Sequence, residues 1–202
     1  MKLYDYKMAP NPRRVRIFLA EKDVQLPDEQ IDLAKAQNRS PEFLKINPFG
    51  GVPVLQLDDG TILAETVAIC RYFEETHPET RLMGTDARDK ALVEMWQRRM
   101  ELYLFASVTG AFRNTSDFFK GRIPQVPEYG EVCRQAAEKM FGMIDGFLAD
   151  SKFIAGERYT IADITALVAV DFARLVKLRI VPEQRNLARW YEAVSSRPSA
   201  KA

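Results

Sequence analysis

Residues 50–66 constrain the fold more than any other part of the chain, and they read GGVPVLQLDDGTILAET. An Asp-Gly turn at 59–60 separates two short apolar runs, which predicts a β-hairpin. Pro53 opens the first run. Because proline cannot donate to a sheet ladder, this position favours a cis peptide bond. The second run ends at Glu65 and Thr66, where a helix is predicted to begin.

The same stretch predicts a binding site. A cis bond before Pro53 turns the N–H and C=O of Val52 out of the fold, where an extended peptide can pair with them. The helix that starts at Thr66 offers unpaired N–H groups and a partial positive charge to an anion. Together these features indicate a site for a small peptide with a carboxylate end.

Length and composition exclude several classes of protein. The chain has 202 residues, 47% of them hydrophobic, which is enough for one large or two small domains. No apolar run reaches the roughly 18 residues of a membrane span, and the N-terminus shows no leader, so we expect no membrane partner. Lys and Arg total 29 against 28 Asp and Glu, which gives no basic surface for nucleic acid. Cys70 and Cys133 form no Cys-x-x-Cys pair, so we expect a cytoplasmic protein without a metal.

The chain changes character near residue 80. Before it, strand-like and helix-like runs alternate in the order βαβ, short helix, ββα, which predicts a sheet covered by helices. The predicted strands are 2–6, 30–33, 54–57 and 61–64, and the predicted helices are 12–22, 40–44 and 66–75. Residues 77–86, interrupted by His, Pro, Thr and Gly, separate a first domain, 1–79, from a second, 86–202.

The second domain is predicted to contain only helices. One long helical stretch covers 86–119, a proline-containing loop covers 121–130, and a last helix covers 184–195. A helix over 131–149 is expected to bury one face, which consists of Ala136, Met140, Ile144, Phe147 and Leu148. Thr160 and Asp163 are spaced as a short capping box at another helix start.

This layout resembles the cytosolic glutathione S-transferases, in particular the theta-like bacterial and fungal type. Three strings carry the resemblance: YDYKMAPNPRRVR at 4–16, NPFGGVPVL at 47–55 with ETVAI at 65–69, and YTIADI at 159–164. The resemblance covers essentially the whole chain. It implies a thioredoxin-like N-terminal domain, an all-helical C-terminal domain that carries the hydrophobic substrate site, and a homodimer. It also implies that glutathione, as co-substrate, is conjugated through its sulfur to hydrophobic electrophiles.

The resemblance assigns glutathione-binding roles to six residues: Lys35, Arg39, Val52, Pro53, Glu65 and Thr66. The main-chain groups of Val52 would pair with the cysteinyl part beside the cis-proline Pro53. The carboxylate of Glu65 would meet the γ-glutamyl ammonium, and Thr66 would donate to the γ-glutamyl carboxylate. The two cations would meet the glycine carboxylate.

The chemistry needs a thiolate near neutral pH, whereas a free thiol has a pKa of about 8.5. The family usually supplies a Tyr, Ser or Cys donor in the loop after the first strand. Here that loop, KMAPNP at 7–12, leaves Asn11 as the neutral donor and therefore as the catalytic candidate. Asn11 also precedes Pro12, a pattern typical of a helix N-cap. The alternatives are Tyr6 and a water oriented by a second-domain residue, namely Arg113, Asn114 or Ser116.

Three functions therefore fit the sequence. The first is glutathione conjugation, with Tyr103 on the long helix as the electrophile-site candidate and a core or dimer contact as its other explanation. The second is a glutathione-dependent disulfide or peroxide reductase on the same scaffold. The third is a non-catalytic glutathione-binding module.

Overall fold

The computed structural model describes residues 1–202 and divides the chain into two compact units, Met1–Arg81 with Lys201–Ala202, and Leu82–Ala200. The first unit has the predicted βαβ, short helix, ββα order. Its elements are β1 (Lys2–Asp5), α1 (Pro10–Glu21), β2 (Asp28–Gln30), a 3-10 turn (Gln37–Arg39), α2 (Pro41–Ile46), β3 (Val54–Gln56), β4 (Ile62–Ala64) and α3 (Thr66–Thr76).

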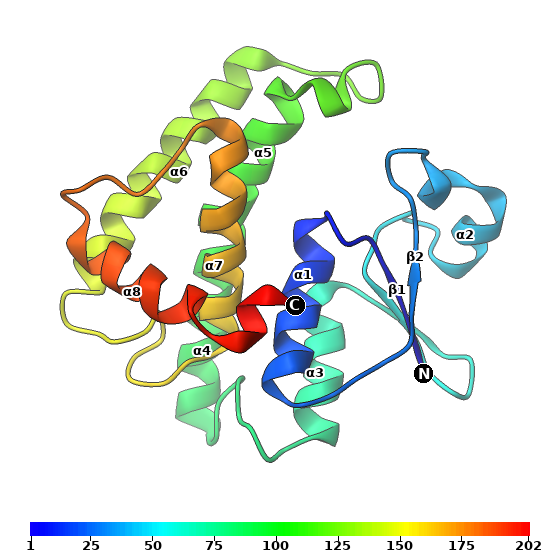
Figure 1. Ribbon diagram of the computed structural model, residues 1–202, viewed down its shortest axis with the longest axis horizontal. Coiled ribbons are helices and arrows are strands. Elements are labelled where there is room, and N and C mark those ends of the chain that lie inside the picture. Colours follow the sequence, from blue (N-terminus) through cyan, green and yellow to red (C-terminus); the bar gives the residue numbers. More distant parts are fainter. The chain divides into compact units, whose positions relative to one another are not determined.

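The sheet has the strand order β2-β1-β3-β4, with β1 and β2 parallel and the other pairs antiparallel. Successive strand residues face opposite sides, so Leu3 and its partner Leu55 face one layer while Tyr4 and its partner Val54 face the other. Tyr4 and Val54 pack with Phe43 of α2 in a buried cluster. Helices α1 and α3 pack together and lie on the opposite side of the sheet from α2 (Figure 1).

The second unit contains only helices. They are α4 (Ala87–Arg99), a π-helical segment (Met100–Phe105), α5 (Ala106–Thr115), a 3-10 turn (Asp117–Phe119), α6 (Pro127–Phe147), α7 (Ile161–Ala173), a 3-10 turn (Arg174–Val176), α8 (Arg185–Ser195) and a last 3-10 turn (Pro198–Lys201). Residues 161–170 of α7 are all buried, because α4, α5, α8 and the π-helical segment pack around this helix. No helix of the chain combines the length and the apolar character that a membrane crossing requires.

Several expected boundaries differ from the structure. The second strand spans Asp28–Gln30 rather than 30–33, and α6 begins at Pro127 inside the predicted loop. Proline needs no N–H partner in the first turn of a helix, so it starts α6 rather than preventing it. The long stretch is helical from 87 to 115 and includes the π-helical segment.

The inner face predicted for α6 is wrong in part. Ala136 is exposed and the side chain of Phe147 is 50% exposed. The buried face instead consists of Gly130, Cys133, Ala137, Phe141, Ile144 and, just after the helix, Leu148. This face has the same helical spacing as the predicted one, and only its members at 144 and 148 were anticipated.

Candidate functional site

The sheet register brings the segments that adjoin β1, β3 and β4 to one end of the strands, which we call the edge of the sheet. Val54, the first residue of β3, pairs with Ala64, the last residue of β4. The chain therefore enters β3 at the same end of the sheet where β4 leads into α3. On its other side, β3 runs antiparallel to β1, so the loop at residues 6–9 leaves β1 at the same edge. Residues that are far apart in the sequence therefore meet where these strands end.

The Val52–Pro53 junction has the expected conformation, because this peptide bond is cis. Pro53 is buried, and Val52 packs its half-buried side chain against the cluster that contains Phe43. The side chain of Val52 is thus anchored in the core, and its main chain forms the entrance to β3.

The start of α3 offers unpaired main-chain donors. Thr66 is the first residue of this helix and is 6% exposed, and the helix start has no side-chain cap. Its first N–H groups therefore lack an intrahelical partner and suit an anion. Glu65 precedes it at φ 70 and ψ 125, a conformation that costs a non-glycine residue on the order of 1–3 kcal/mol. Its side chain remains exposed.

Three side chains hold the loop before β3, and only Arg39 among them was singled out from the sequence. Asn47 is 5% exposed, and its Nδ2 donates to the Gly51 carbonyl at 2.9 Å. Asn38 Nδ2 donates to the Gly50 carbonyl at 2.7 Å. Arg39 Nη1 donates to the Phe49 carbonyl at 3.3 Å. These contacts place the guanidinium of Arg39 against the loop, whereas its expected role is with a ligand.

Lys35 is the more available of the two predicted cations. Its side chain is 85% exposed and makes an ion pair of 3.4 Å with Asp32. The backbone N–H of Lys35 donates to Asp32, and this bond is the main reason that the pKa of Asp32 is lowered. The exposed pair can be exchanged for a ligand carboxylate at little cost, since surface ion pairs contribute only about 0–1 kcal/mol.

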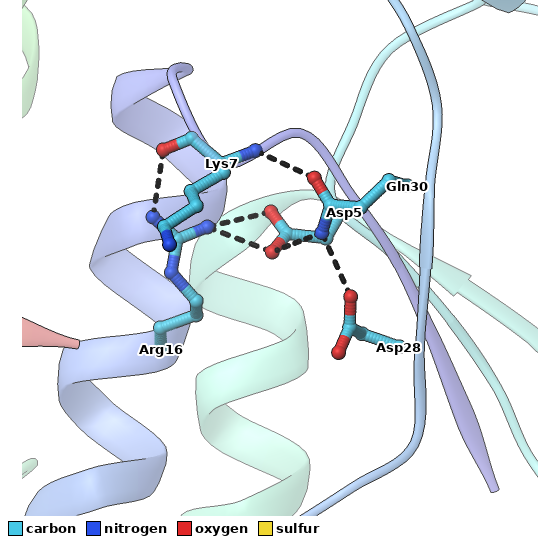
Figure 2. A network of polar contacts seen from close by, with 5 residues as sticks. All are labelled: Asp5, Lys7, Arg16, Asp28 and Gln30. Atoms are coloured by element: carbon cyan, nitrogen blue, oxygen red, sulfur yellow. Dashed lines mark hydrogen bonds and ion pairs between the residues drawn. The ribbon is translucent and has the colours of Figure 1, made fainter.

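A polar network, which we call the loop clamp, holds the segment that follows β1 (Figure 2). Arg16 Nη1 lies 2.7 and 2.8 Å from the two carboxylate oxygens of Asp5, which is 2% exposed. Arg16 Nη2 donates to the Lys7 carbonyl at 3.0 Å, while the Lys7 N–H donates to Gln30 Oε1 at 2.9 Å. Gln30 Nε2 donates in turn to Asp5 at 3.1 Å and Asp28 at 2.8 Å. Both main-chain polar groups of Lys7 are therefore fixed.

Asn11 lies in the first turn of α1 rather than at its N-cap. The helix begins at Pro10 and the N-cap residue is Ala9, so the capping role expected for Asn11 is wrong. Its amide is half-buried, and its Oδ1 accepts a hydrogen bond of 3.2 Å from Arg14 Nη1. Tyr6, the alternative donor, is half-buried in the loop that the clamp holds.

The candidates in the second unit have structural partners. Asn114 uses both ends of its amide, donating to the Gly110 carbonyl at 2.9 Å and accepting from the Val126 N–H at 2.9 Å. Ser116 Oγ accepts from the Phe118 N–H at 3.2 Å. The Arg113 guanidinium lies over the ring of Phe119, 5.0 Å from its centroid. These contacts shape the turn after α5.

Tyr103 lies in the π-helical segment, and its side chain is 60% exposed. Segments of this kind occur frequently at functional sites. Neither cysteine forms a disulfide, and both are buried, with Cys70 at 1% and Cys133 at 8% exposure. The structure contains no group of three or more His, Cys, Asp or Glu side chains arranged to hold a metal ion.

Comparisons with known proteins match both units. The family model "Glutathione S-transferase, N-terminal domain" matches residues 1–75, and "Glutathione S-transferase, C-terminal domain" matches residues 118–198. Glutathione S-transferase 2 of Saccharomyces cerevisiae is 36% identical over 208 residues, which cover 100% of this chain and 88% of the yeast protein. The crystal structure of Gtt2 from Saccharomyces cerevisiae has a TM-score of 0.94 at 35% identity, covering 100% of this chain and 99% of its own. A glutathione S-transferase domain-containing protein from Marinobacter aquaeolei VT8 has a TM-score of 0.94 at 33% identity, covering 98% and 99%.

Proposed function

Because the chain belongs to the glutathione S-transferase family, we propose that residues 1–79 bind glutathione along the edge where β1, β3 and β4 meet. Residues 86–202 would carry the site for a hydrophobic electrophile. The observation that carries this proposal is the uncapped start of α3, preceded by Glu65 at positive φ, at the end of the sheet where β3 begins and β4 ends. A zwitterionic amino-acid end, with its carboxylate toward the N–H donors and its ammonium toward Glu65, fits that arrangement.

Glutathione would lie antiparallel to the entrance of β3. The main-chain N–H and C=O of Val52 would pair with its cysteinyl unit, with Pro53 setting the direction of that chain. Thr66 and the first N–H groups of α3 would bind the γ-glutamyl carboxylate, while Glu65 would accept from the ammonium group. Lys35 would bind the glycine carboxylate, with Arg39 acting mainly on the loop before β3.

Activation of the thiol would rest on Asn11. Lowering a thiol pKa by about two units requires about 2.7 kcal/mol. A hydrogen bond to a charged group contributes about 1.5–3 kcal/mol, and a helix N-terminus contributes about 0.3–1 kcal/mol more. The sulfur would lose its proton to solvent, and the thiolate would attack the electrophilic carbon and form the carbon–sulfur bond. The displaced group would leave with its electron pair.

Replacing Glu65 by Gln tests the glutathione site. The variant keeps the side-chain length but loses the charge that faces the ammonium, so we expect about tenfold weaker glutathione binding by titration calorimetry, about 1.4 kcal/mol. Glu75→Gln at the far end of α3, where Glu75 pairs with Arg71 at 3.7 Å, is the matched control and should bind normally. An unchanged dissociation constant for Glu65→Gln would show that Glu65 does not meet the ligand.

The alternative functions have less support from the structure. A reductase that forms a mixed disulfide needs an accessible protein thiolate, and both cysteines are buried. A module without catalysis would bind glutathione and leave its thiol pKa unchanged. Assays of aryl-halide conjugation and of thiol–disulfide exchange on the same preparation separate these functions, and exchange without conjugation would favour the reductase.

We also propose a cytoplasmic homodimer, for which the exposed apolar side chains give a physical reason. Leu92 and Met95 on α4, and Leu102 and Tyr103 in the π-helical segment, are 37–60% exposed at near-helical spacing. Such a stripe is either a protein interface or a wall of the electrophile site. Cysteines without a disulfide fit a reducing compartment such as the cytoplasm, which cell fractionation tests.

Tyr103→Ala distinguishes the two uses of this stripe. If Tyr103 meets the electrophile, we expect an unchanged sedimentation coefficient and a KM for a hydrophobic electrophile raised about tenfold, corresponding to about 1.4 kcal/mol of lost contact. If it lies in the dimer interface, dissociation will increase in dilute solution and the KM for glutathione will stay the same. A chain that sediments as a monomer at all concentrations would refute the dimer.

A further inference from the structure

We propose that Arg14 is a positioning residue for thiol activation: it binds the oxygen of the Asn11 amide and thereby turns the NH2 group of Asn11 toward the glutathione sulfur. This inference rests on the proposed sulfur contact of Asn11. It adds the reason why Asn11 presents its NH2 donor rather than its carbonyl oxygen to the sulfur, because an amide can present either group.

The geometry leaves one orientation for the amide. Arg14 Nη1 lies 3.2 Å from Asn11 Oδ1, and the two residues are one helical turn apart on α1. A guanidinium has five N–H donors and no acceptor, so the atom that faces it must be the amide oxygen. The NH2 group then points away from Arg14, and neither of its hydrogens takes part in the bond to Arg14.

The surroundings make this bond effective. Arg14 is 2% exposed, so its guanidinium meets Asn11 away from bulk water, where a charged donor holds its partner more strongly. Asn11 does not cap its helix, because the N-cap residue is Ala9. Its amide is therefore not needed by the main chain and can serve a ligand.

The orientation matters because the two amide faces have opposite effects on a thiolate. An NH2 group stabilises the anion by a charge-assisted hydrogen bond, whereas the carbonyl oxygen repels it. An amide that can flip would average the two effects. A buried cation on the oxygen removes the unfavourable orientation before the ligand arrives, which is preorganisation of a hydrogen-bond donor.

Arg14 and Arg16 have separable tasks. Arg16 belongs to the loop clamp, which fixes the main chain at Lys7 through bonds that do not involve Arg14 (Figure 2). Loss of Arg14 therefore leaves these bonds of the loop in place and removes the bond that holds the amide of Asn11. This separation allows a test of positioning apart from a test of folding.

The test is a double-mutant cycle on the pKa of bound glutathione, measured from the ultraviolet absorbance of the thiolate. We expect Asn11→Ala and Arg14→Met each to raise that pKa by about one unit, and the double variant to raise it no further. Affinity for S-methylglutathione, which has no ionisable thiol, should stay within about twofold in all three. Arg14→Lys keeps a charged donor and should recover at least about half of the shift.

Four outcomes overturn the inference and can be told apart. A larger shift in the double variant would mean that Arg14 acts on the sulfur through its own charge. A parallel loss of S-methylglutathione binding would mean a structural role. No shift in Asn11→Ala with normal binding would remove the proposed sulfur contact as well. Absence of glutathione binding by the unaltered protein would instead refute the proposed function.

If Arg14→Met does not fold, the unaltered protein still provides a test. The side-chain amide resonances of Asn11 in ¹⁵N NMR should shift as the bound thiol ionises, because its NH2 donates to the sulfur. Resonances that do not move through that titration would overturn the inference.

Discussion

Asp163→Ala is expected to destabilise the second unit by about 3–5 kcal/mol, enough to unfold a marginally stable domain. The Asp163 carboxylate is fully buried and accepts four hydrogen bonds. Its Oδ1 accepts from the Ile154 N–H at 2.9 Å and from Trp190 Nε1 at 2.8 Å. Its Oδ2 accepts from the Thr160 N–H at 2.9 Å and from Thr160 Oγ1 at 3.2 Å.

The cost arises because one side chain joins three segments. It completes the capping box of α7, holds the preceding loop at Ile154 and anchors the fully buried Trp190 of α8. Alanine would leave these buried donors without a partner. Urea unfolding followed by circular dichroism measures the loss. Thr160→Ser, which keeps the capping hydroxyl, is the control and should cost less than about 1 kcal/mol. A loss below about 1 kcal/mol for Asp163→Ala would contradict the prediction.

The same carboxyl should make stability depend on pH. Burial raises the pKa of Asp163 from 3.8 to about 6, against the opposing effect of its hydrogen bonds. The folded state therefore binds the proton more tightly than the unfolded state, and the Asp163 contribution to the free energy of unfolding falls as the pH rises from about 4 to about 6. Between about pH 5 and pH 7 the loss is about 1 kcal/mol. Asp163→Asn should lack this part of the pH profile.

Lys22→Met is expected to destabilise the first unit by about 3–5 kcal/mol, because it removes one partner of a buried ion pair with Glu74. Lys22 Nζ lies 2.8 Å from Glu74 Oε2, and both side chains are 1% exposed. The same ammonium donates to the His77 carbonyl at 2.8 Å and the Thr80 carbonyl at 2.6 Å. It thus joins the ends of α1 and α3 to the chain that follows them.

The chain offers a matched control for this ion pair. Lys2 and Glu29 also lie 2.8 Å apart, but their side chains are 39% and 48% exposed. Lys2→Met should therefore cost no more than about 1 kcal/mol. Lys22→Met combined with Glu74→Met should recover part of the single-variant loss, because no unpaired charge remains buried. Equal losses of unfolding free energy for Lys22→Met and Lys2→Met would show that burial does not govern what each ion pair contributes to stability.

Local patterns in the sequence were sufficient to predict the main-chain conformation at the proposed glutathione-binding edge. The Asp-Gly turn, the proline at the strand entrance and the helix that begins at Thr66 all have the predicted conformations. Each depends on only a few neighbouring residues, so the sequence carries the information locally. The capping box at Thr160 and Asp163 was predictable for the same reason.

Side chains that join distant segments were not predictable. Asn38, Arg16 and Gln30 bond to loops that lie 9 to 23 residues away, and no spacing rule relates them to those loops. The N-cap expected at Asn11 was wrong because Pro10, one residue earlier, already begins the helix. The bond from Arg14 then assigns its amide a different task.

The sequence alone determined the order of the elements, the two-unit plan and the residues at the edge of the sheet, because turn chemistry and periodicity act over short distances. The tertiary structure decided which face of α6 is buried and which of two Lys–Glu pairs is shielded from water. It also decided which way the Asn11 amide points. Burial and charge pairing depend on partners from other elements, and only the folded chain brings those partners together.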